Sequence, residues 1–375
     1  MDFAFSDEQE AFREMVRGFL AETSPTAEVF RLIETPEGFD RGVWKQMAEE
    51  LGLQSIRIPE ASGGQGFGFL ELGLVMEEMG HALLCAPYFS TVCLAANAIL
   101  NAGSERDQRA LLPGIAAGDT IATLAVVDSA ESWSVSDVTL EFARDGDAYR
   151  LNGSKAYVTD GCSAELILVA ARRPGTTGTD GITLLTVRGD AKGLVTRPIE
   201  PLDATRKIAS LELSDAPAEL LGEEGTAGPA LARTLDQACV ALASESIGSA
   251  QYCLDSAVEY AKQRFQFGRP IGSFQAIKHK CAEVLLELET ARSAAYYASW
   301  AAENDAELPL AASVAKSCCD EANLRAAAEN LHIHGGIGFT WEADPHLFYK
   351  RARATEALLG GRAQHRARIA DLHGF

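Results

Sequence analysis

The stretch Tyr260-Ala-Lys-Gln-Arg264-Phe-Gln-Phe267-Gly268-Arg269-Pro270-Ile271-Gly272-Ser273-Phe274-Gln275 joins two long helical patterns. The first helix is expected to deliver Arg264 and to stop at Gly268 and Pro270, and a second helix restarts near Ser273. A guanidinium beside a new helix N-terminus and an aromatic face suits a diphosphate joined to a flat ring. The alternative is a plain helical hairpin that carries a surface arginine.

Long helical segments rich in Ala, Glu and Leu surround this stretch from about Thr226 to the end of the chain. Small and apolar residues recur along one of them at helical spacing, at Leu235, Cys239, Leu242, Ser246 and Ala250. Long helices with small contact residues suit a tight bundle, and such a bundle often has a spare face for oligomerisation.

Two further segments, each with its own residue pattern, precede the predicted bundle. The first is helical and opens at Ser6, which forms a capping box with Gln9. The second is rich in β-formers and turns, and it predicts a small antiparallel sandwich or barrel. Its expected strands are Ile121–Val127, Val138–Phe142, Tyr149–Leu151, Lys155–Thr159, Leu166–Ala170, Ile182–Val187 and Ile208–Leu213. We therefore predict an α+β protein with a helical domain at 1–119, a β-domain at 120–225 and a helical bundle at 226–375.

Composition restricts the class of protein. The 375 residues are 47% hydrophobic and carry a formal net charge of −20, which is the mix of a folded globular chain that repels nucleic acid and anionic lipid. No apolar run approaches the roughly 18 residues of a membrane span. The acidic start lacks a signal peptide, and the eight cysteines show no regular spacing, so we expect a cytoplasmic protein with reduced thiols.

Simple catalytic and metal motifs are weak or absent. His332 and His334 alternate in sequence and do not share a helical face, so no metal site is predicted. Gly335-Gly336-Ile337-Gly338 lacks the strand and helix context of a dinucleotide fold. Neither a nucleophile elbow nor a P-loop occurs.

Four segments together resemble the flavin-dependent acyl-CoA dehydrogenase family. They are RFQFGRPIGSFQ at Arg264–Gln275, LHIHGGIGFTWEADPHLFYKRA at Leu331–Ala352, NGSKAYVTDG at Asn152–Gly161 and IPEASGGQGFGFLELGLVMEEMG at Ile58–Gly80. The helical, β, helical order over the whole chain also matches this family.

The resemblance implies an N-terminal helical domain, a central β-domain and a C-terminal four-helix domain. It implies that FAD lies between the β-domain and the C-terminal helices and touches a neighbouring subunit. The implied reaction is α,β-desaturation of an acyl-CoA thioester: a carboxylate removes the α-proton while the β-hydrogen leaves as hydride to the flavin. An electron-transferring flavoprotein is the implied re-oxidant.

Site residues carried over from the resemblance fall into two groups. Thr159 stands where a family Thr hydrogen-bonds the flavin near N5, and Tyr157 replaces the usual Trp beside the ring. The second group matches positions that hold the FAD of the neighbouring subunit: Arg264, Phe267, Gln275, Gly335 and Gly336, with His332 where Gln is common.

Other positions depart from the family pattern. Val126–Glu131 replaces the strand that lines flavin and substrate, and Cys239 replaces the usual Arg on the first C-terminal helix. Leu359 occupies the position of the commonest catalytic Glu and cannot take a proton. The family's alternative base aligns with Ala238.

The retained and lost residues resemble those of heteromeric acyl-CoA dehydrogenases from bacteria that degrade steroid side chains, in which two related chains share each flavin site. We therefore expect a homo- or hetero-oligomer that binds FAD and acyl-CoA. The alternative is a non-catalytic subunit that completes the FAD site of a paralogous partner.

One carboxylate could still serve as the base of an autonomous enzyme. Glu245 lies two turns after Ala238 in an apolar setting that would strengthen its hold on a proton. The alternative is a structural Glu bonded to a neighbouring helix. The basic residues of the tail, among them Arg351, could meet CoA or FAD phosphates, but pairing with the abundant Asp and Glu is favoured.

Overall fold

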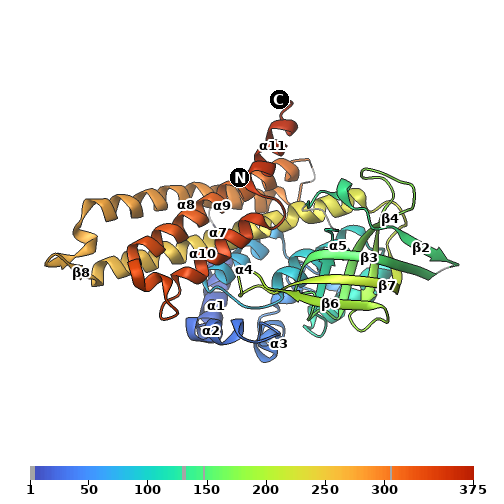
Figure 1. The fold of residues 1–375 in the computed structure, drawn as a ribbon, viewed down its shortest axis with the longest axis horizontal. Helices are drawn as coiled ribbons and strands as arrows, with labels where there is room; N and C mark the ends of the chain where they lie inside the picture. The colour runs from blue at the N-terminus through green and yellow to red at the C-terminus, as the bar shows by residue number, and fades with distance from the viewer. Residues whose placement is uncertain (1–4, 129–131, 147, 305) are drawn as a thin grey trace. The chain divides into compact units, whose positions relative to one another are not determined.

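The chain folds into two compact units, and each unit combines segments that are separate in the sequence. The computed structural model describes residues 5–128, 132–146, 148–304 and 306–375. Its first unit comprises Met1–Arg31, Phe69–Leu84 and Cys239–Phe375, and its second unit comprises Leu32–Gly68 and Cys85–Ala238 (Figure 1). The domain boundaries expected from the sequence, at 1–119, 120–225 and 226–375, stay a prediction.

The first unit is helical. Its elements are α1 (Asp7–Thr23), α4 (Phe69–His81), β8 (Phe265–Gln266), β9 (Arg269–Pro270), η5 (Ile271–Ser273), α8 (Gln275–Ala301), α9 (Leu308–His334), η6 (Gly335–Phe339), α10 (Pro345–Ala357) and α11 (Arg362–Leu372). Helices α2 (Thr26–Ile33) and α7 (Gly228–Gln263) cross from one unit into the other. The capping box of Ser6 and Gln9 at the start of α1 is confirmed.

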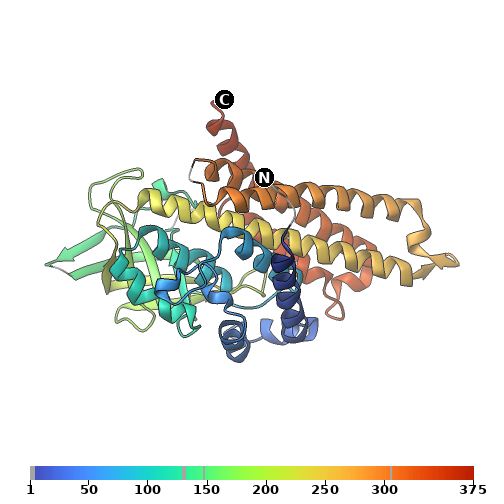
Figure 2. The ribbon, with the colours of Figure 1, turned by 180° about the vertical axis from the view of Figure 1, so that it is seen from behind.

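Helix α9 is contacted by α8, α10 and α11, while α1 packs on α4 and α4 on α8 (Figure 2). The small-residue stripe of α7 is buried as predicted. Gly80 and Gly248 show why small residues are needed: a Cβ at Gly80 would lie 2.0 Å from the carbonyl oxygen of Glu245 on α7, and one at Gly248 would lie 1.8 Å from that of Glu77 on α4. Helices α4 and α7 therefore meet backbone to backbone.

The second unit combines short helices with a seven-stranded sheet. Its helical elements are α3 (Arg41–Glu49), η1 (Leu53–Ser55), η2 (Glu60–Ser62), the π-helix η3 (Phe89–Ala96), α5 (Asn97–Ala102), α6 (Glu105–Ala116) and η4 (Val135–Asp137). Its strands are β1 (Ala122–Ala125), β2 (Phe142–Asp145), β3 (Ala148–Thr159), β4 (Leu166–Arg172), β5 (Ile182–Arg188), β6 (Leu194–Ile199) and β7 (Ile208–Leu221). The sheet runs β1-β4-β5-β7-β3-β2, with β6 on β7.

This sheet is antiparallel, as predicted, except that β1 pairs with β4 in parallel. The long strand β7 pairs with β3 along most of its length and with β6 and then β5 along its other edge. One face carries a core of aliphatic and aromatic side chains that includes Phe142, Leu151 and Leu211. The strands that the sequence separated at Tyr149–Leu151 and Lys155–Thr159 form the single strand β3.

Two local predictions are wrong. Val138–Phe142 is not a strand, and β2 begins only at Phe142. The reason is that the carboxylate of Asp128 takes the backbone N–H groups of Thr139 and Leu140, which a ladder would need. The helix before Arg264 ends at Gln263, because the chain turns there into the β8–β9 hairpin.

Among the described residues, no helix has both the length and the apolar character that crossing a bilayer requires. Five of the eight cysteines are buried: Cys85, Cys93, Cys239, Cys253 and Cys319. The reduced state expected from their spacing stays a prediction.

Candidate functional site

The end of α7 and the hairpin that follows it form one tip of the helical unit. The amide of Arg264 still donates to the carbonyl of Tyr260 at 2.8 Å, and the carbonyl of Arg264 accepts from the amide of Ile271 at 2.8 Å. Between these bonds, Phe267 and Gly268 take φ values of 54° and 77°, which reverse the chain within two residues. The hairpin therefore presents Arg264 and Phe267 beyond the last turn of the helix.

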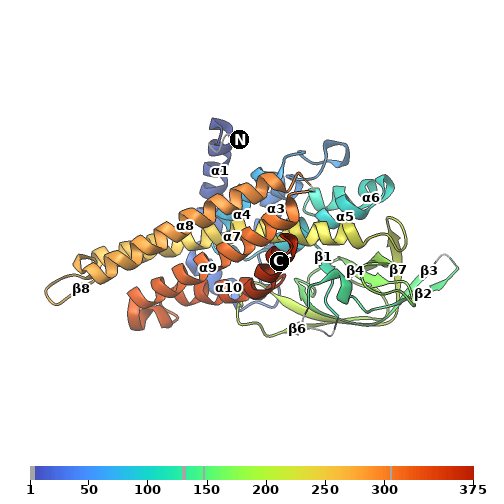
Figure 3. The same cartoon turned by 90° about the horizontal axis from the view of Figure 1, so that it is seen from above.

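The end of α9 lies beside this hairpin (Figures 1 and 3). The ring of Tyr260 on α7 stacks on that of His334 on α9 with centroids 4.1 Å apart, and Ile333 shares a small core with Ala261. Helix α9 then stops at Gly335, whose φ of 65° and ψ of −140° suit glycine alone. The two segments that resemble the FAD-holding motifs thus come together.

The chain's own packing does not account for what this tip exposes. A Cβ at Gly335 or at Gly336 would meet nothing within 4 Å. Phe267 is 90% exposed, and Phe265 and Phe339 are also exposed. Arg264, Gln275 and His332 all have exposed side chains. Aromatic rings and a guanidinium gathered in the open are typical of a surface that another molecule covers. The six residues of the predicted set in this unit therefore share one exposed end.

The two remaining predicted cofactor residues lie in the second unit, near the end of β3. Tyr157 has a φ of 54° where the pairing of β3 with β7 is irregular, and its side chain is 40% exposed. Positive φ costs a non-glycine residue about 1 kcal/mol, so the surroundings hold Tyr157 in a strained conformation. Thr159 is buried, and its carbonyl accepts from the hydroxyl of Thr123 at 2.7 Å.

A buried ion pair stands beside these residues, at the segment that departs from the family pattern. Lys155 is buried and donates to the carboxylate of Asp128 at 2.5 Å and to the carbonyl of Val126 at 2.8 Å. Burial lowers the pKa of Lys155 to about 8, although Asp128 acts in the opposite direction. Burial raises the pKa of Asp128, but the charge of Lys155 and the hydrogen bonds from Lys155 and Thr139 lower it by more. The pKa of Asp128 therefore lies below its usual range. Residues 129–131 of the predicted departure lie outside the described residues.

The position of the family's usual base is closed by apolar packing. Leu359 is 5% exposed and has a φ of 62°, with Gly360 after it at 101°. The buried His365 lies 3.2 Å from the carbonyl oxygen of Leu359 through Nε2 and 3.3 Å from the hydroxyl of Ser313 through Nδ1. Because a carbonyl only accepts, Nε2 carries the proton. Burial together with the nearby Lys316 lowers the pKa of His365 to about 4.

Glu245, the candidate base, is 5% exposed and lies in an ion pair. Its Oε1 accepts from Nη1 of Arg351 on α10 at 2.9 Å, and Arg351 is also buried. A guanidinium at this distance stabilises the ionised carboxylate. This geometry favours the structural alternative for Glu245, and it places Arg351 with an acidic partner, as expected for the tail. Ala238 is fully buried and offers no base.

Three features of this region were not predicted from the sequence: the partner of Glu245, the Lys155–Asp128 pair and the anchoring of Leu359 by His365. Glu245 and Arg351 lie 106 positions apart, so no local pattern connects them. Lys155 had a usable signal, since it falls on the same side of β3 as the buried Leu151. The described residues contain no cluster of three or more His, Cys, Asp or Glu side chains that could hold a metal ion.

Comparison with known families matches nearly the whole chain. Residues 6–119 match the model of the acyl-CoA dehydrogenase N-terminal domain, residues 128–215 that of the middle domain and residues 228–372 that of the C-terminal domain.

Individual proteins agree with these matches. The chain is 33% identical over 353 residues to acyl-CoA dehydrogenase IpdE2 of Mycobacterium tuberculosis, covering 94% of this chain and 93% of that one. A chain of the Tcur3481-Tcur3483 steroid ACAD G363A variant superposes with a TM-score of 0.88 at 32% identity, over 98% of each chain. A chain of the ChsE4-ChsE5 complex from Mycobacterium tuberculosis gives 0.90 at 27% identity, over all of each chain.

Members of this family are FAD-dependent oxidoreductases that act on the CH–CH bond of acyl-CoA. The three domain matches in their order, and the relative that aligns over almost the full length of both chains, show that this chain belongs to the acyl-CoA dehydrogenase family.

Proposed function

We propose that this chain is one subunit of a heteromeric, FAD-dependent acyl-CoA dehydrogenase, in which it completes a flavin site together with a related chain. The observation that carries the proposal is the exposed tip of the helical unit. Its arginine and its aromatic rings are exposed, and its two glycines have open space beside them. They suit a group held by a neighbouring subunit.

The residues present fit FAD. Arg264 brings a permanent charge to an exposed position where a diphosphate could be reached, and Gln275 begins α8, after the same hairpin. The absence of side chains at Gly335 and Gly336 allows close approach of a ligand to the backbone. In the second unit, Tyr157 offers an exposed ring face and Thr159 a hydroxyl. The chemistry that bound FAD supplies is acceptance of the β-hydrogen of the acyl group as hydride.

This chain lacks an evident catalytic base for the α-proton of the acyl group. Leu359 cannot accept the α-proton, and the carboxylate of Glu245 is held by Arg351. Both points support the second candidate function, a subunit without a base of its own that completes the site of a catalytic partner. Two of the similar structures are named as pairs of chains, Tcur3481-Tcur3483 and ChsE4-ChsE5, which supports assembly with a related chain.

The name of one similar structure also supports a proposal for the substrate. Because one similar structure is named a steroid ACAD, we propose an acyl-CoA from steroid or lipid breakdown as the substrate. An electron-transferring flavoprotein would take the electrons. The cytoplasm would suit the free thiols and the charge of −20.

The visible absorption spectrum tests both candidate functions. If the chain purified alone is yellow and acyl-CoA bleaches it, it is an autonomous enzyme, and both candidate functions are contradicted. If it is a partner-completing subunit, it is colourless alone and becomes yellow only when co-purified with its related chain, and the pair is then bleached. A colourless chain that gives no flavin absorption with any co-expressed acyl-CoA dehydrogenase chain would contradict both.

A further inference from the structure

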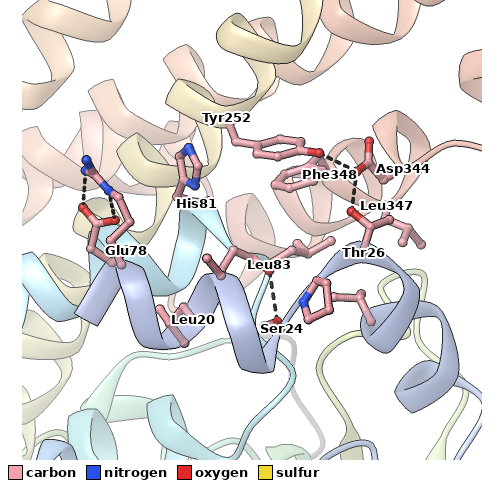
Figure 4. A pocket seen from close by; sticks show the side chains of 15 residues that line it. Leu20, Ser24, Thr26, Glu78, His81, Leu83, Tyr252, Asp344, Leu347 and Phe348 are labelled. Carbon is pink, nitrogen blue, oxygen red and sulfur yellow. Dashed lines mark hydrogen bonds and ion pairs between the residues drawn. The ribbon is translucent and has the colours of Figure 1, made fainter. Parts of the chain in front are cut away.

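A cavity of about 360 Å³ lies wholly within the first unit, where the ends of α1 and α4 face α7 and the start of α10 (Figure 4). Its volume is in the range of small-molecule sites in proteins. None of the residues predicted to serve FAD or the acyl group lines it. The cavity is therefore separate from the features that the proposed function uses.

Most of the wall is apolar. Leu20 comes from α1, Leu83 from the end of α4 and Leu347 from α10. The ring of Tyr252 on α7 stacks on that of Phe348 with centroids 4.2 Å apart and planes at 10°. This pair gives the cavity a rigid aromatic side, which suits an apolar ring in a ligand.

Charged groups at the two ends of the cavity are already paired or hydrogen-bonded. At one end, Arg17 donates to both oxygens of Glu78, at 2.9 and 2.8 Å. At the other end, Asp344 accepts from the hydroxyl of Tyr252 at 2.5 Å and from that of Thr26 at 2.9 Å. Arg13 also donates to the carboxylate of Glu78, at 3.0 Å, so both guanidinium groups at this end are already engaged. The carboxylate of Asp344, whose two donors are neutral hydroxyls, disfavours an anion at the other end, so the phosphates of CoA are poorly suited to this cavity.

His81 lies between these two ends (Figure 4). Its ring meets that of Tyr252 edge-on, with centroids 5.4 Å apart. Across the part of the chain that the structure describes, neither ring nitrogen of His81 has a hydrogen-bond partner. Burial lowers the pKa of His81, so the imidazole is neutral at pH 7 and presents one donor and one acceptor. A half-buried imidazole with both nitrogens free is the polar group that this cavity offers to a ligand.

We propose that the cavity binds a small uncharged molecule made of an apolar ring and one hydroxyl or carbonyl group, and that this polar group hydrogen-bonds to His81. The apolar walls and the stacked pair accommodate the ring. The carboxylate of Asp344 disfavours anions, and the neutral imidazole of His81 offers a hydrogen bond to a single polar group of the ligand.

Calorimetric titration of the assembled, FAD-loaded protein with p-cresol, p-xylene and benzoate tests the proposal. The first two probes have nearly the same shape and differ by one hydroxyl, while benzoate is an anion. We expect p-cresol to bind about tenfold more tightly than p-xylene, since one hydrogen bond is worth about 1 kcal/mol, and benzoate to bind more weakly than either.

Variants then locate the site. His81→Leu should reduce the affinity for p-cresol to that for p-xylene, and Ala82→Trp, which fills the cavity, should abolish binding of both. His279→Leu removes an exposed histidine of α8 away from the cavity and should change nothing. If Ala82→Trp does not fold, Leu20→Trp blocks the cavity from α1.

Three results would overturn the proposal. They are equal affinities for p-cresol and p-xylene, binding of p-cresol that persists in the folded cavity-filled variant, and absence of any binding because a side chain of a partner subunit fills the cavity in the assembly. The flavin absorption is recorded during each titration. A ligand that shifts this spectrum and ignores the cavity variants has entered a flavin site instead.

Discussion

Two regions of the helical unit show opposite relationships between sequence and surroundings. The tip formed by Arg264–Gln275 and His332–Gly336 carries residues that the resemblance assigns to FAD and leaves them exposed, and a Cβ at Gly335 or Gly336 would have no neighbour within 4 Å. In the loop Leu358–Gly361, Leu359 stands at the position that the resemblance assigns to the family's catalytic carboxylate. Its side chain is buried, and its carbonyl accepts a hydrogen bond from His365. One region needs another molecule to be complete, and the other is complete without one.

The difference indicates which constraint has acted on each region. A residue that serves only its own chain's packing becomes buried or paired, as Glu245 and Arg351 have. An apolar residue that stays exposed, such as Phe267, is costly unless something covers it. We infer that the tip has a task outside the chain, whereas the loop near Leu359 has become part of the core. The predictions below test the two regions in turn.

The largest effect is expected at the Glu245–Arg351 pair. Glu245→Gln removes the negative charge that lies 2.9 Å from the buried guanidinium of Arg351, so we expect a loss of about 3–5 kcal/mol in the free energy of unfolding, measured by urea denaturation. Flavin bleaching by acyl-CoA in the assembled protein should persist, because the carboxylate acts in packing. Glu287→Gln, which breaks a more exposed pair with Arg325, is the matched control and should cost less than about 1 kcal/mol.

If instead Glu245→Gln folds with unchanged stability and abolishes bleaching while FAD stays bound, Glu245 is the base. The contrast drawn between the two regions would then fail at its central residue.

The next largest effect concerns His365 and the closed loop. Because the pKa of His365 is lowered to about 4 in the folded chain, the unfolded chain binds the extra proton between about pH 6.5 and pH 4. Stability therefore falls as the pH falls through this window, by up to about 3 kcal/mol. In His365→Gln, which keeps a donor for the carbonyl of Leu359, this loss should be absent. Urea denaturation of both proteins from pH 7 to pH 4 measures the difference.

Neighbouring charges must be considered in this measurement. Lys316 and Arg368 act on His365 directly, and both lower its pKa. Burial raises the pKa of Asp320, the ion-pair partner of Lys316, to about 6, so Asp320 acts with the opposite sign. Asp320 is present in both proteins and its contribution cancels in the comparison. Parallel curves for the two proteins would mean that His365 is not held neutral beneath the loop.

Sequence patterns predicted well whatever depends on neighbours along the chain. The capping box at Ser6, the small stripe of α7 and the β-rich middle are consequences of local periodicity and turn chemistry. Predictions were wrong where a distant group took part. At Thr139 and Leu140, alternation indicated a strand, but the carboxylate of Asp128 removed the N–H groups that a strand would pair.

The same distinction between local patterns and distant interactions applies to the candidate site. The motif residues at Arg264 and Gly335 could be recognised from the sequence because each motif is contiguous. That they lie side by side depends on the stacking of Tyr260 on His334, which no local pattern contains. Likewise, an apolar neighbourhood suggested that Glu245 could be a base, whereas its ion pair with Arg351 arises only when α7 meets α10.

A smaller effect is expected at the exposed tip. Arg264→Ala should weaken FAD binding about ten- to hundredfold, since a charge-assisted hydrogen bond to a phosphate contributes about 1.5–3 kcal/mol. The free energy of unfolding of the chain alone should change by less than about 0.5 kcal/mol, because the side chain is exposed. Titration of FAD into the assembled apoprotein measures the first quantity. Lys262→Ala, an exposed cation in the last turn of α7, is the control.

Equal weakening by Lys262→Ala would mean that general positive charge, and not the position of Arg264, holds the cofactor. Unchanged FAD binding in Arg264→Ala would remove the tip from the flavin site altogether.

The smallest effect is expected at Tyr157 in the sheet unit, where strain and exposure occur together. Glycine adopts a φ of 54° without strain, so Tyr157→Gly should raise the free energy of unfolding by about 0.5–1 kcal/mol. Removal of the ring should at the same time weaken FAD binding, because the exposed face of Tyr157 is the proposed stacking surface. Asp215→Gly relieves a similar φ of 51° at an exposed irregular position of β7 and should stabilise the protein equally without changing FAD affinity. A stabilised Tyr157→Gly protein with full FAD affinity would show that this strain has a purely structural origin, since a residue kept strained for the cofactor cannot be replaced without loss of binding.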